Sequence, residues 1–140
     1  MRILPLLAAL VFSTPVMAGP NDAVRPYPPQ QVAAGTYVIH GPQGVPSAAN
    51  QSFMNNPAWV VTNEGVVVID PGSSVQVGRM VVEQIRKTTD KPIRYVFDTH
   101  YHGDHADGNP VFAKIGATAI ASENAKAEFE TKGIAGFEKS

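Results

Sequence analysis

The stretch VVVIDPGSSVQVGRMVVEQIRKTTDKPIRYVFDTHYHGDH, residues 66–105, contains a strand, a turn, a helix, a second strand and a polar loop by its pattern. Residues 66–70 are almost wholly apolar, which is typical of a strand covered on both faces. Residues 75–88 carry one apolar stripe at helical spacing, formed by Val77, Met80, Val81 and Ile85. Pro92 disfavours helix at the preceding residue, so residues 93–98 are expected to form the next strand. The alternation of strands and helices predicts an α/β layered fold.

The segments on either side extend this pattern. Residues 58–62 should form a β-hairpin with residues 66–70, because Asn63–Glu64–Gly65 between them is a turn sequence in which Gly takes a positive φ. Residues 41–56 are rich in Pro, Gly and Asn and are expected to form a loop or lid. The other expected elements are a strand at 35–41, a short helix at 110–114, a strand at 117–121 and a helix from Ser122 to about Lys132.

The N-terminus has the pattern of a secretory signal peptide. Arg2 precedes the apolar run 3–12, and Val16 and Ala18 provide small side chains for cleavage before Gly19. The run is too short to span a bilayer, which takes about 20 apolar residues, and the alternative is a buried N-terminal strand or helix. We therefore expect a periplasmic or secreted protein. Its expected divisions are a signal peptide at 1–18, an extended proline-rich leader at 19–34 and a folded domain at 35–140.

Charge and cysteine content exclude several kinds of partner and site. The sequence has 11 Lys and Arg against 12 Asp and Glu, and it contains no basic cluster. This balance argues against nucleic acid or an anionic membrane as a partner. The chain has no cysteine, so an exported domain must fold without disulfides. Any metal ion must then be held by nitrogen and oxygen ligands.

Three of the four histidines lie in one short segment directly after the strand predicted at 93–98. In an extended loop, residues two apart point to the same side, so His100 and His102 can hold one ion together. Asp104 and His105 follow where the chain turns towards the next helix, and they can aim at a neighbouring point. These groups suit Zn²⁺, and the same set also accepts Fe or Mn. The alternative is a solvated polar loop without metal, and His40, alone in a strand, is expected to be structural.

The motif VVVIDPG at 66–72, followed by THYHGDH at 99–105, resembles the metallo-β-lactamase superfamily, whose first two motifs are an Asp at a strand end and HxHxDH. The segments TDKPIRYVFDTHYHGDHADGN and NPVFAKIGATAIAS look most like the periplasmic zinc metallohydrolases of the quinoprotein relay type. They are similar also to hydroxyacylglutathione hydrolases and to lactamases with a His-rich second motif. The resemblance runs from about residue 35 to residue 132. It implies a four-layer αββα sandwich, of which this chain looks like the N-terminal half.

The resemblance also implies roles for the residues that match its motifs. His100 and His102 would bind a first zinc ion, and Asp104 and His105 would bind a second. Asp104 would also orient the metal-bound water or accept its proton, which makes it the expected catalytic residue. Asp70 would support the metal loop by hydrogen bonding without binding the metal itself. Zinc lowers the pKa of bound water from 15.7 to about 7, so the implied reaction is attack of hydroxide on a carbonyl, ester, thioester or lactam of a small molecule.

The later motifs of the family supply further ligands, whereas no histidine follows His105 in this sequence. We therefore expect the 140-residue chain to be incomplete and inactive as an enzyme. Its apolar strands lack the second half that would cover one sheet face, which predicts self-association through that face. Two other hypotheses stay open. One is an iron-dependent relative that oxidises sulfur compounds, and the other is a non-catalytic metal-binding or interaction module.

Overall fold

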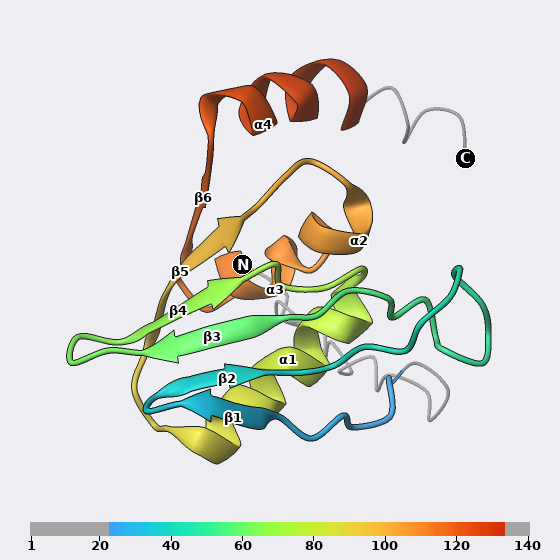
Figure 1. Ribbon diagram of the computed structural model, residues 1–140. Coiled ribbons are helices and arrows are strands. Elements are labelled where there is room, and N and C mark those ends of the chain that lie inside the picture. The colour runs from blue at the N-terminus through green and yellow to red at the C-terminus, as the bar shows by residue number, and fades with distance from the viewer. Residues whose placement is uncertain (1–22, 134–140) are drawn as a thin grey trace, which may run out of the picture.

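The computed structural model describes residues 23–133, and its centre is a six-stranded mixed sheet in the order β1-β2-β3-β4-β5-β6 (Figure 1). The strands are β1 (Gln30–Ala33), β2 (Thr36–Val38), β3 (Ala58–Val61), β4 (Val66–Ile69), β5 (Ile93–Asp98) and β6 (Thr118–Ala121). The helices are α1 (Val75–Thr88), α2 (Gly103–Ala106), α3 (Asn109–Lys114) and α4 (Glu123–Glu128), followed by a π-helical segment at Phe129–Gly133. The predicted α/β fold is confirmed.

The stretch from β4 to β5 has the structure that its pattern predicts. Helix α1 and strand β5 begin and end at the predicted residues. Ser74 caps α1, because its Oγ accepts a hydrogen bond from the backbone N of Val77 at 3.1 Å. The β3–β4 hairpin turns through Gly65, whose φ of 153° is accessible to glycine without strain. Local signals were sufficient for these elements.

The direction of the strands brings separate parts of the chain to one edge of the sheet. Strands β1 to β4 form an antiparallel series, whereas β4, β5 and β6 run parallel. Within the parallel part, Ile69 pairs with Phe97. Parallel neighbours end at the same edge, so the residues that follow β4 and β5 lie side by side. Asp70 therefore lies next to the start of the histidine-rich loop.

Helices α1 and α3 pack on one face of the sheet and enclose the hydrophobic core (Figure 1). The core includes Val66, Val68 and Val96 from the strands, Val77, Val81 and Ile85 from α1, and Phe112 from α3. Trp59 is fully buried among them, with its ring stacked on Tyr37 at a centroid distance of 5.4 Å. Its indole N–H donates to Thr88 Oγ1 at 3.1 Å, which satisfies the polar end of the ring in the core.

The opposite face of the sheet bears exposed apolar side chains. Tyr95, Phe97 and Ile120 are 46%, 42% and 42% exposed. Phe97 pairs with Ile120 across β5 and β6, and Tyr95 lies two residues before Phe97, so all three point to the same side. We call these three residues the bare face. The strand composition predicts cover on both faces, and residues 23–133 provide it on one.

The segment before residue 35 differs from the predicted leader. Its last part, Gln30–Ala33, is strand β1, which pairs with β2 after a turn at Gly35 with φ 66°. All four side chains of β1 are exposed, so no apolar alternation marks it as a strand in the sequence. Residues 1–22, which include the expected signal peptide, lie outside the described residues. Across the described range, no helix has both the length and the apolar character needed to cross a membrane.

Candidate metal centre

The histidine-rich loop leaves the sheet at the end of β5 and returns to the core at α3. Its centre is the single helical turn α2, in which the backbone N of Asp107 donates to the Gly103 oxygen at 2.9 Å. The sequence predicts an extended loop that turns towards the next helix, and the structure places this turn at α2. The turn folds His105 back towards His100, so residues five positions apart come into contact.

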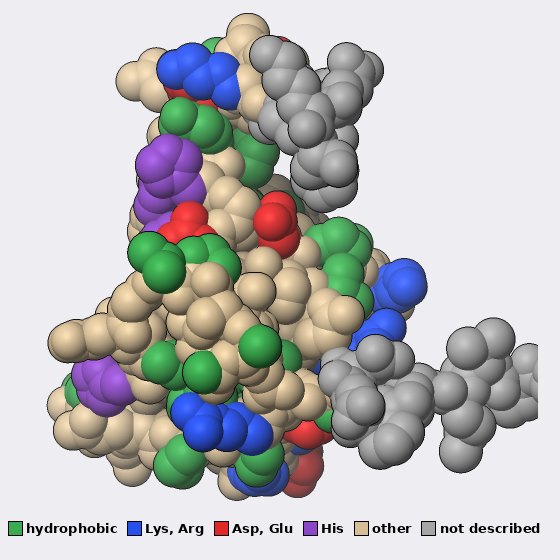
Figure 2. Space-filling model, turned by 90° about the vertical axis from the view of Figure 1, so that its right-hand side faces the viewer, with side chains coloured by type: hydrophobic (Ala, Val, Ile, Leu, Met, Phe, Trp, Pro, Cys, Tyr) green, Lys and Arg blue, Asp and Glu red, His purple; other side chains and the backbone are tan. Residues whose placement is uncertain are grey.

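Three imidazole rings gather on this loop. The ring centroid of His100 lies 4.7 Å from that of His102 and 4.1 Å from that of His105. Asp104 Oδ2 lies 3.3 Å from His105 Nε2. Figure 2 shows histidine and acidic side chains close together on the surface, beneath the C-terminal helical segment. The four residues that the motif marks as ligands therefore occupy one patch.

Asp70 holds the loop from the end of the neighbouring strand. It is only 7% exposed and adopts a φ of 51°. Its Oδ1 accepts a hydrogen bond from the backbone N of Thr99 at 2.8 Å. Its Oδ2 accepts another from Thr99 Oγ1 at 2.9 Å and lies 2.8 Å from His105 Nδ1. A carboxylate bonded in this way fixes the position of the loop and the orientation of the His105 ring.

Asn55 supports Asp70 in turn. Its Nδ2 donates to the backbone oxygen of Asp70 at 3.0 Å, and its side chain is buried. The left-handed conformation of Asp70 costs about 1–3 kcal/mol for a residue other than glycine, and contacts of this kind must offset that cost. Sequence reasoning missed Asn55 because it lies in the turn-rich segment 41–56, where Asn is expected as a turn former.

The turn after β4 and the end of the loop meet through backbone atoms. The backbone N of Gly108 donates to the Gly72 oxygen at 2.9 Å. A Cβ atom on Gly108 would lie 2.5 Å from the Pro71 oxygen, so only glycine permits this approach. The Asp-Pro-Gly turn and the histidine-rich loop are therefore packed together as one unit.

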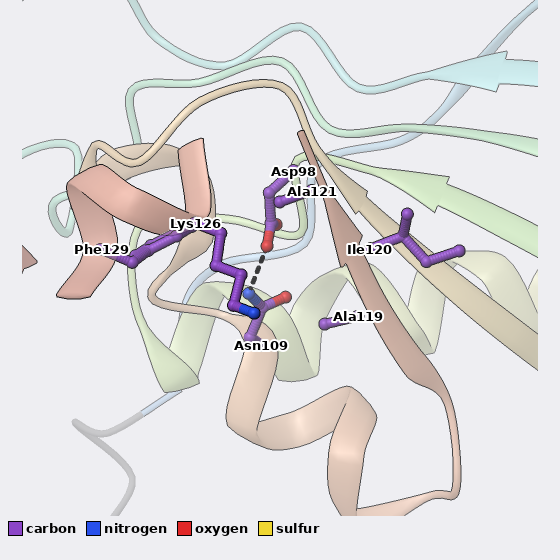
Figure 3. Close-up of a pocket in the computed structure, with 7 residues that line it drawn as sticks. All are labelled: Asp98, Asn109, Ala119, Ile120, Ala121, Lys126 and Phe129. Atoms are coloured by element: carbon purple, nitrogen blue, oxygen red, sulfur yellow. Dashed lines mark hydrogen bonds between the residues drawn. The ribbon is translucent and has the colours of Figure 1, made fainter. Parts of the chain in front are cut away.

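A partly buried side-chain hydrogen bond joins the two ends of the loop. Asn109 Nδ2 donates to Asp98 Oδ2 at 2.7 Å, beside an open pocket of about 490 Å³ (Figure 3). Asp98 is 2% exposed, and this burial raises its pKa from the ordinary value of 3.8 to about 6. The Asn109 hydrogen bond and His105 oppose the rise in pKa, whereas the charge of Asp70 adds to it. Neither end residue is part of the motif, so the sequence did not indicate this pair.

The donors on the loop fit a metal ion that prefers nitrogen and oxygen. His100 Nδ1 lies 3.0 Å from Thr99 Oγ1, and His105 Nδ1 is bonded to Asp70, so one nitrogen in each of these two rings is held by an oxygen. Such outer partners are usual for metal-binding histidines. Among residues 23–133, no three His, Asp or Glu side chains already stand at the spacing of a filled metal site. The residues therefore fit a metal by donor type, and their side chains would have to rearrange to hold an ion together.

The fourth histidine lies elsewhere in the molecule. His40 follows β2, and its Nε2 lies 3.0 Å from Gln30 Oε1 on β1. The contact joins the ends of two paired strands, and the His40 side chain is otherwise exposed. The strand expected at 35–41 ends at Val38, so His40 lies just beyond it, and its structural role stays a prediction.

The family model of the metallo-β-lactamase superfamily matches residues 52–140. The chain belongs to this superfamily. The matched range includes Asp70 and the whole histidine-rich loop. The finer resemblance to superfamily members of the quinoprotein relay type stays a prediction.

The superfamily relatives similar to this chain are hydrolases with different substrates. The linear primary-alkylsulfatase of Pseudomonas sp. (strain ATCC 19151) is 43% identical over 49 residues, which are 35% of this chain and 9% of the sulfatase. A solved B3 metallo-β-lactamase with an active-site glutamic acid is 27% identical, with a TM-score of 0.58 over 76% of this chain and 37% of the lactamase. The lactamase FIM-1 from Pseudomonas aeruginosa, solved in a mono-zinc form, is 17% identical, with a TM-score of 0.63 over 81% of this chain and 49% of FIM-1. The chain thus spans less than half the length of each of these relatives.

Proposed function

We propose that this protein is an exported, zinc-dependent hydrolase of the metallo-β-lactamase superfamily that acts on a small molecule. The observation that carries the proposal is the gathering of three imidazole rings on one loop that Asp70 holds from behind. The relatives support hydrolysis as the type of reaction. The bond attacked would belong to a carbonyl, ester, thioester or lactam group. The pattern of residues 1–18 supports export to the periplasm or the medium.

The roles follow from the positions of the residues in the motif. His100 and His102 would hold a first ion, and Asp104 and His105 would hold a second in the complete enzyme. When bound, zinc would lower the pKa of its water from 15.7 to about 7 and polarise the bond that is cleaved. Asp104, with a side chain that is 33% exposed, would accept the proton of the attacking water. Asp70 would keep the His105 ring oriented through its contact with Nδ1.

We also propose that residues 35–140 supply the first half of the catalytic domain. The chain spans 37% of the B3 lactamase and 49% of FIM-1, which supports this proposal. In a four-layer αββα sandwich, a second sheet would cover the bare face. The chain alone would then bind metal weakly and hydrolyse little, because the ligands expected from the second half are absent from it.

Zinc binding by the full chain tests the site directly. His102→Ala removes one predicted ligand and should lower zinc affinity by at least about 10-fold, since a missing ligand costs no less than a missing outer partner. Equilibrium dialysis with zinc, followed by metal analysis, measures the change. His40→Ala is the matched control, because this imidazole lies beside β1 rather than on the loop, and its loss should leave zinc binding unchanged. Full zinc retention by His102→Ala would show that the site is wrong.

The same metal analysis separates zinc from iron chemistry. Imidazole and carboxylate ligands fit both ions, and selection depends on geometry and supply. Protein purified with iron in place of zinc would favour the hypothesis that this protein is an iron-dependent superfamily member that oxidises sulfur compounds. Protein purified with zinc would favour hydrolysis.

The bare face favours a second candidate function, a non-catalytic metal-binding module that pairs with a second copy of itself. Tyr95, Phe97 and Ile120 expose a contiguous apolar surface on β5 and β6, and such surfaces mark interaction sites. In this hypothesis a second chain covers the sheet in place of a second half-domain. Retained metal without turnover, at the mass of two chains, would support it.

A further inference from the structure

The side chain of Thr99 lies between Asp70 and His100. Its Oγ1 is 2.9 Å from Asp70 Oδ2 and 3.0 Å from His100 Nδ1. The backbone N of the same residue donates to Asp70 Oδ1 at 2.8 Å, so the Asp70 carboxylate accepts two hydrogen bonds from Thr99. The backbone hydrogen bond to Asp70 therefore fixes the position of Thr99 independently of the hydroxyl group.

The number of protons available to Asp70, Thr99 and His100 determines which atom donates in each hydrogen bond. An ionised carboxylate only accepts hydrogen bonds, so the single proton of the Thr99 hydroxyl is donated to Asp70. The hydroxyl oxygen can then only accept from His100. A neutral imidazole carries its proton on one of two nitrogens, and here that nitrogen must be Nδ1. The other nitrogen of His100, Nε2, keeps its lone pair.

His105 contacts Asp70 directly, without an intermediate residue. Its Nδ1 lies 2.8 Å from Asp70 Oδ2, which can only accept, so Nδ1 carries the proton in this ring as well. Asp70 thus selects the tautomer of His105 by direct contact and that of His100 through Thr99. Both rings then present an unprotonated Nε2, the form in which histidine binds a metal.

We propose that Thr99 is a positioning residue whose hydroxyl relays the hydrogen bond of Asp70 to His100 and holds the Nε2 atom of His100 free for a metal ion. The tautomer follows from the contacts of this chain alone. The consequence for metal binding rests on the proposed function. The two parts are therefore tested by separate measurements.

Substitution of Thr99 separates the hydroxyl from the rest of its contacts. Thr99→Val keeps the branched shape and the backbone N–H that donates to Asp70, and it removes only the hydroxyl. Thr99→Ser keeps the hydroxyl and should restore the relay. His105 is an internal control in both variants, because its bond to Asp70 does not pass through Thr99. Thr118→Val is an external control for the same substitution at an exposed position on β6.

The tautomers are measured by ¹⁵N NMR of the histidine rings in the metal-free full chain at about pH 8, where an ordinary imidazole is neutral. We expect the Nδ1–H form at His100 and His105 in the wild type and in Thr99→Ser. In Thr99→Val, His100 should shift towards the Nε2–H form while His105 stays unchanged. An Nε2–H form at His100 in the wild type would overturn the proposal, and this test holds even if Thr99→Val fails to fold. An unchanged His100 in folded Thr99→Val would overturn it as well.

Zinc titration of the same four proteins tests the consequence for the metal. Loss of an outer partner of a metal-binding histidine typically lowers affinity about 10- to 100-fold, which is the loss expected for Thr99→Val. Thr99→Ser and Thr118→Val should bind zinc as the wild type does. A shifted tautomer with unchanged zinc affinity would contradict the role of Thr99 at the metal. Complete absence of zinc binding by the wild type, including the weak binding expected of this chain, with the expected tautomers present, would overturn the proposed function and leave the relay intact.

Discussion

The two faces of the sheet differ in burial although their side chains are chemically alike. On the face covered by α1 and α3, Val68 and Val96 are buried. On the bare face, Tyr95, Phe97 and Ile120 are at least 42% exposed. Both faces carry branched and aromatic side chains that favour strands. The composition of a segment therefore predicts that it forms a strand suited to burial. Whether each of its faces is buried depends on which elements pack against the sheet.

The contrast is sharpest between neighbours on β5. Phe97 points to the bare face, whereas Asp98 points to the covered side and is almost fully buried. The apolar residue is thus the exposed one and the carboxylate the buried one. One oxygen of this carboxylate, Oδ2, accepts a hydrogen bond from Asn109. Three measurements test whether the two faces differ in this way.

The largest expected effect comes from truncating one isoleucine on each side. Ile85→Ala removes a fully buried side chain between α1 and the sheet and should lower the free energy of unfolding by about 2–5 kcal/mol. Ile120→Ala removes an exposed side chain and should change it by no more than about 0.5 kcal/mol. Urea unfolding at low protein concentration measures both. Equal losses would show that the bare face is covered in solution.

The next effect comes from the buried carboxylate of Asp98. Its pKa is raised from 3.8 to about 6, so between these values the folded state binds more protons than the unfolded state. The contribution of Asp98 to stability is therefore present at low pH and is lost as pH rises from about 4 to about 6. Asp98→Asn removes this titration and keeps an oxygen that can accept from Asn109. Between pH 4 and pH 7, the stability of the variant relative to the wild type should rise by roughly 1–3 kcal/mol.

Urea unfolding of the metal-free proteins across this pH range gives the difference directly. Subtracting the two curves removes the contributions of the other titrating groups. Asn109→Ala provides a second check, because it removes the hydrogen bond that opposes the rise in the pKa of Asp98 and should steepen the loss of stability. Parallel curves for wild type and Asp98→Asn would contradict a raised pKa at this position.

The smallest effect on folding is expected at Phe97, where the change should appear in self-association instead. Phe97→Ser should lower the free energy of unfolding by about 1 kcal/mol or less, since the side chain is 42% exposed and serine has the lower strand propensity. It should weaken association if the bare face binds a second chain, and sedimentation equilibrium measures this. Ile115→Ser is the matched control, because Ile115 is 45% exposed after α3 and outside the bare face. An equal effect of both variants on association would rule out a specific role for the bare face.

The candidate site was predictable where its residues are close in sequence. His100, His102, Asp104 and His105 form one motif, so their proximity needs only a loop that turns once. Asp70 was marked by its position at a strand end. The partners that hold these residues were missed: Thr99 because a threonine before the motif has many ordinary uses, and Asn55 because it lies in a turn-rich segment.

Local sequence patterns specify the secondary-structure elements and the candidate ligand side chains. Apolar spacing, the cap at Ser74 and the break at Pro92 set the limits of α1 and β5, because each acts over a few neighbouring residues. The tertiary structure brings Asp70 to Thr99, since this contact requires β4 and β5 to pair in parallel with Ile69 opposite Phe97. It also decided which face of the sheet stays bare. Strand register and the packing of helices depend on contacts between residues far apart in the chain, and no local pattern specifies them.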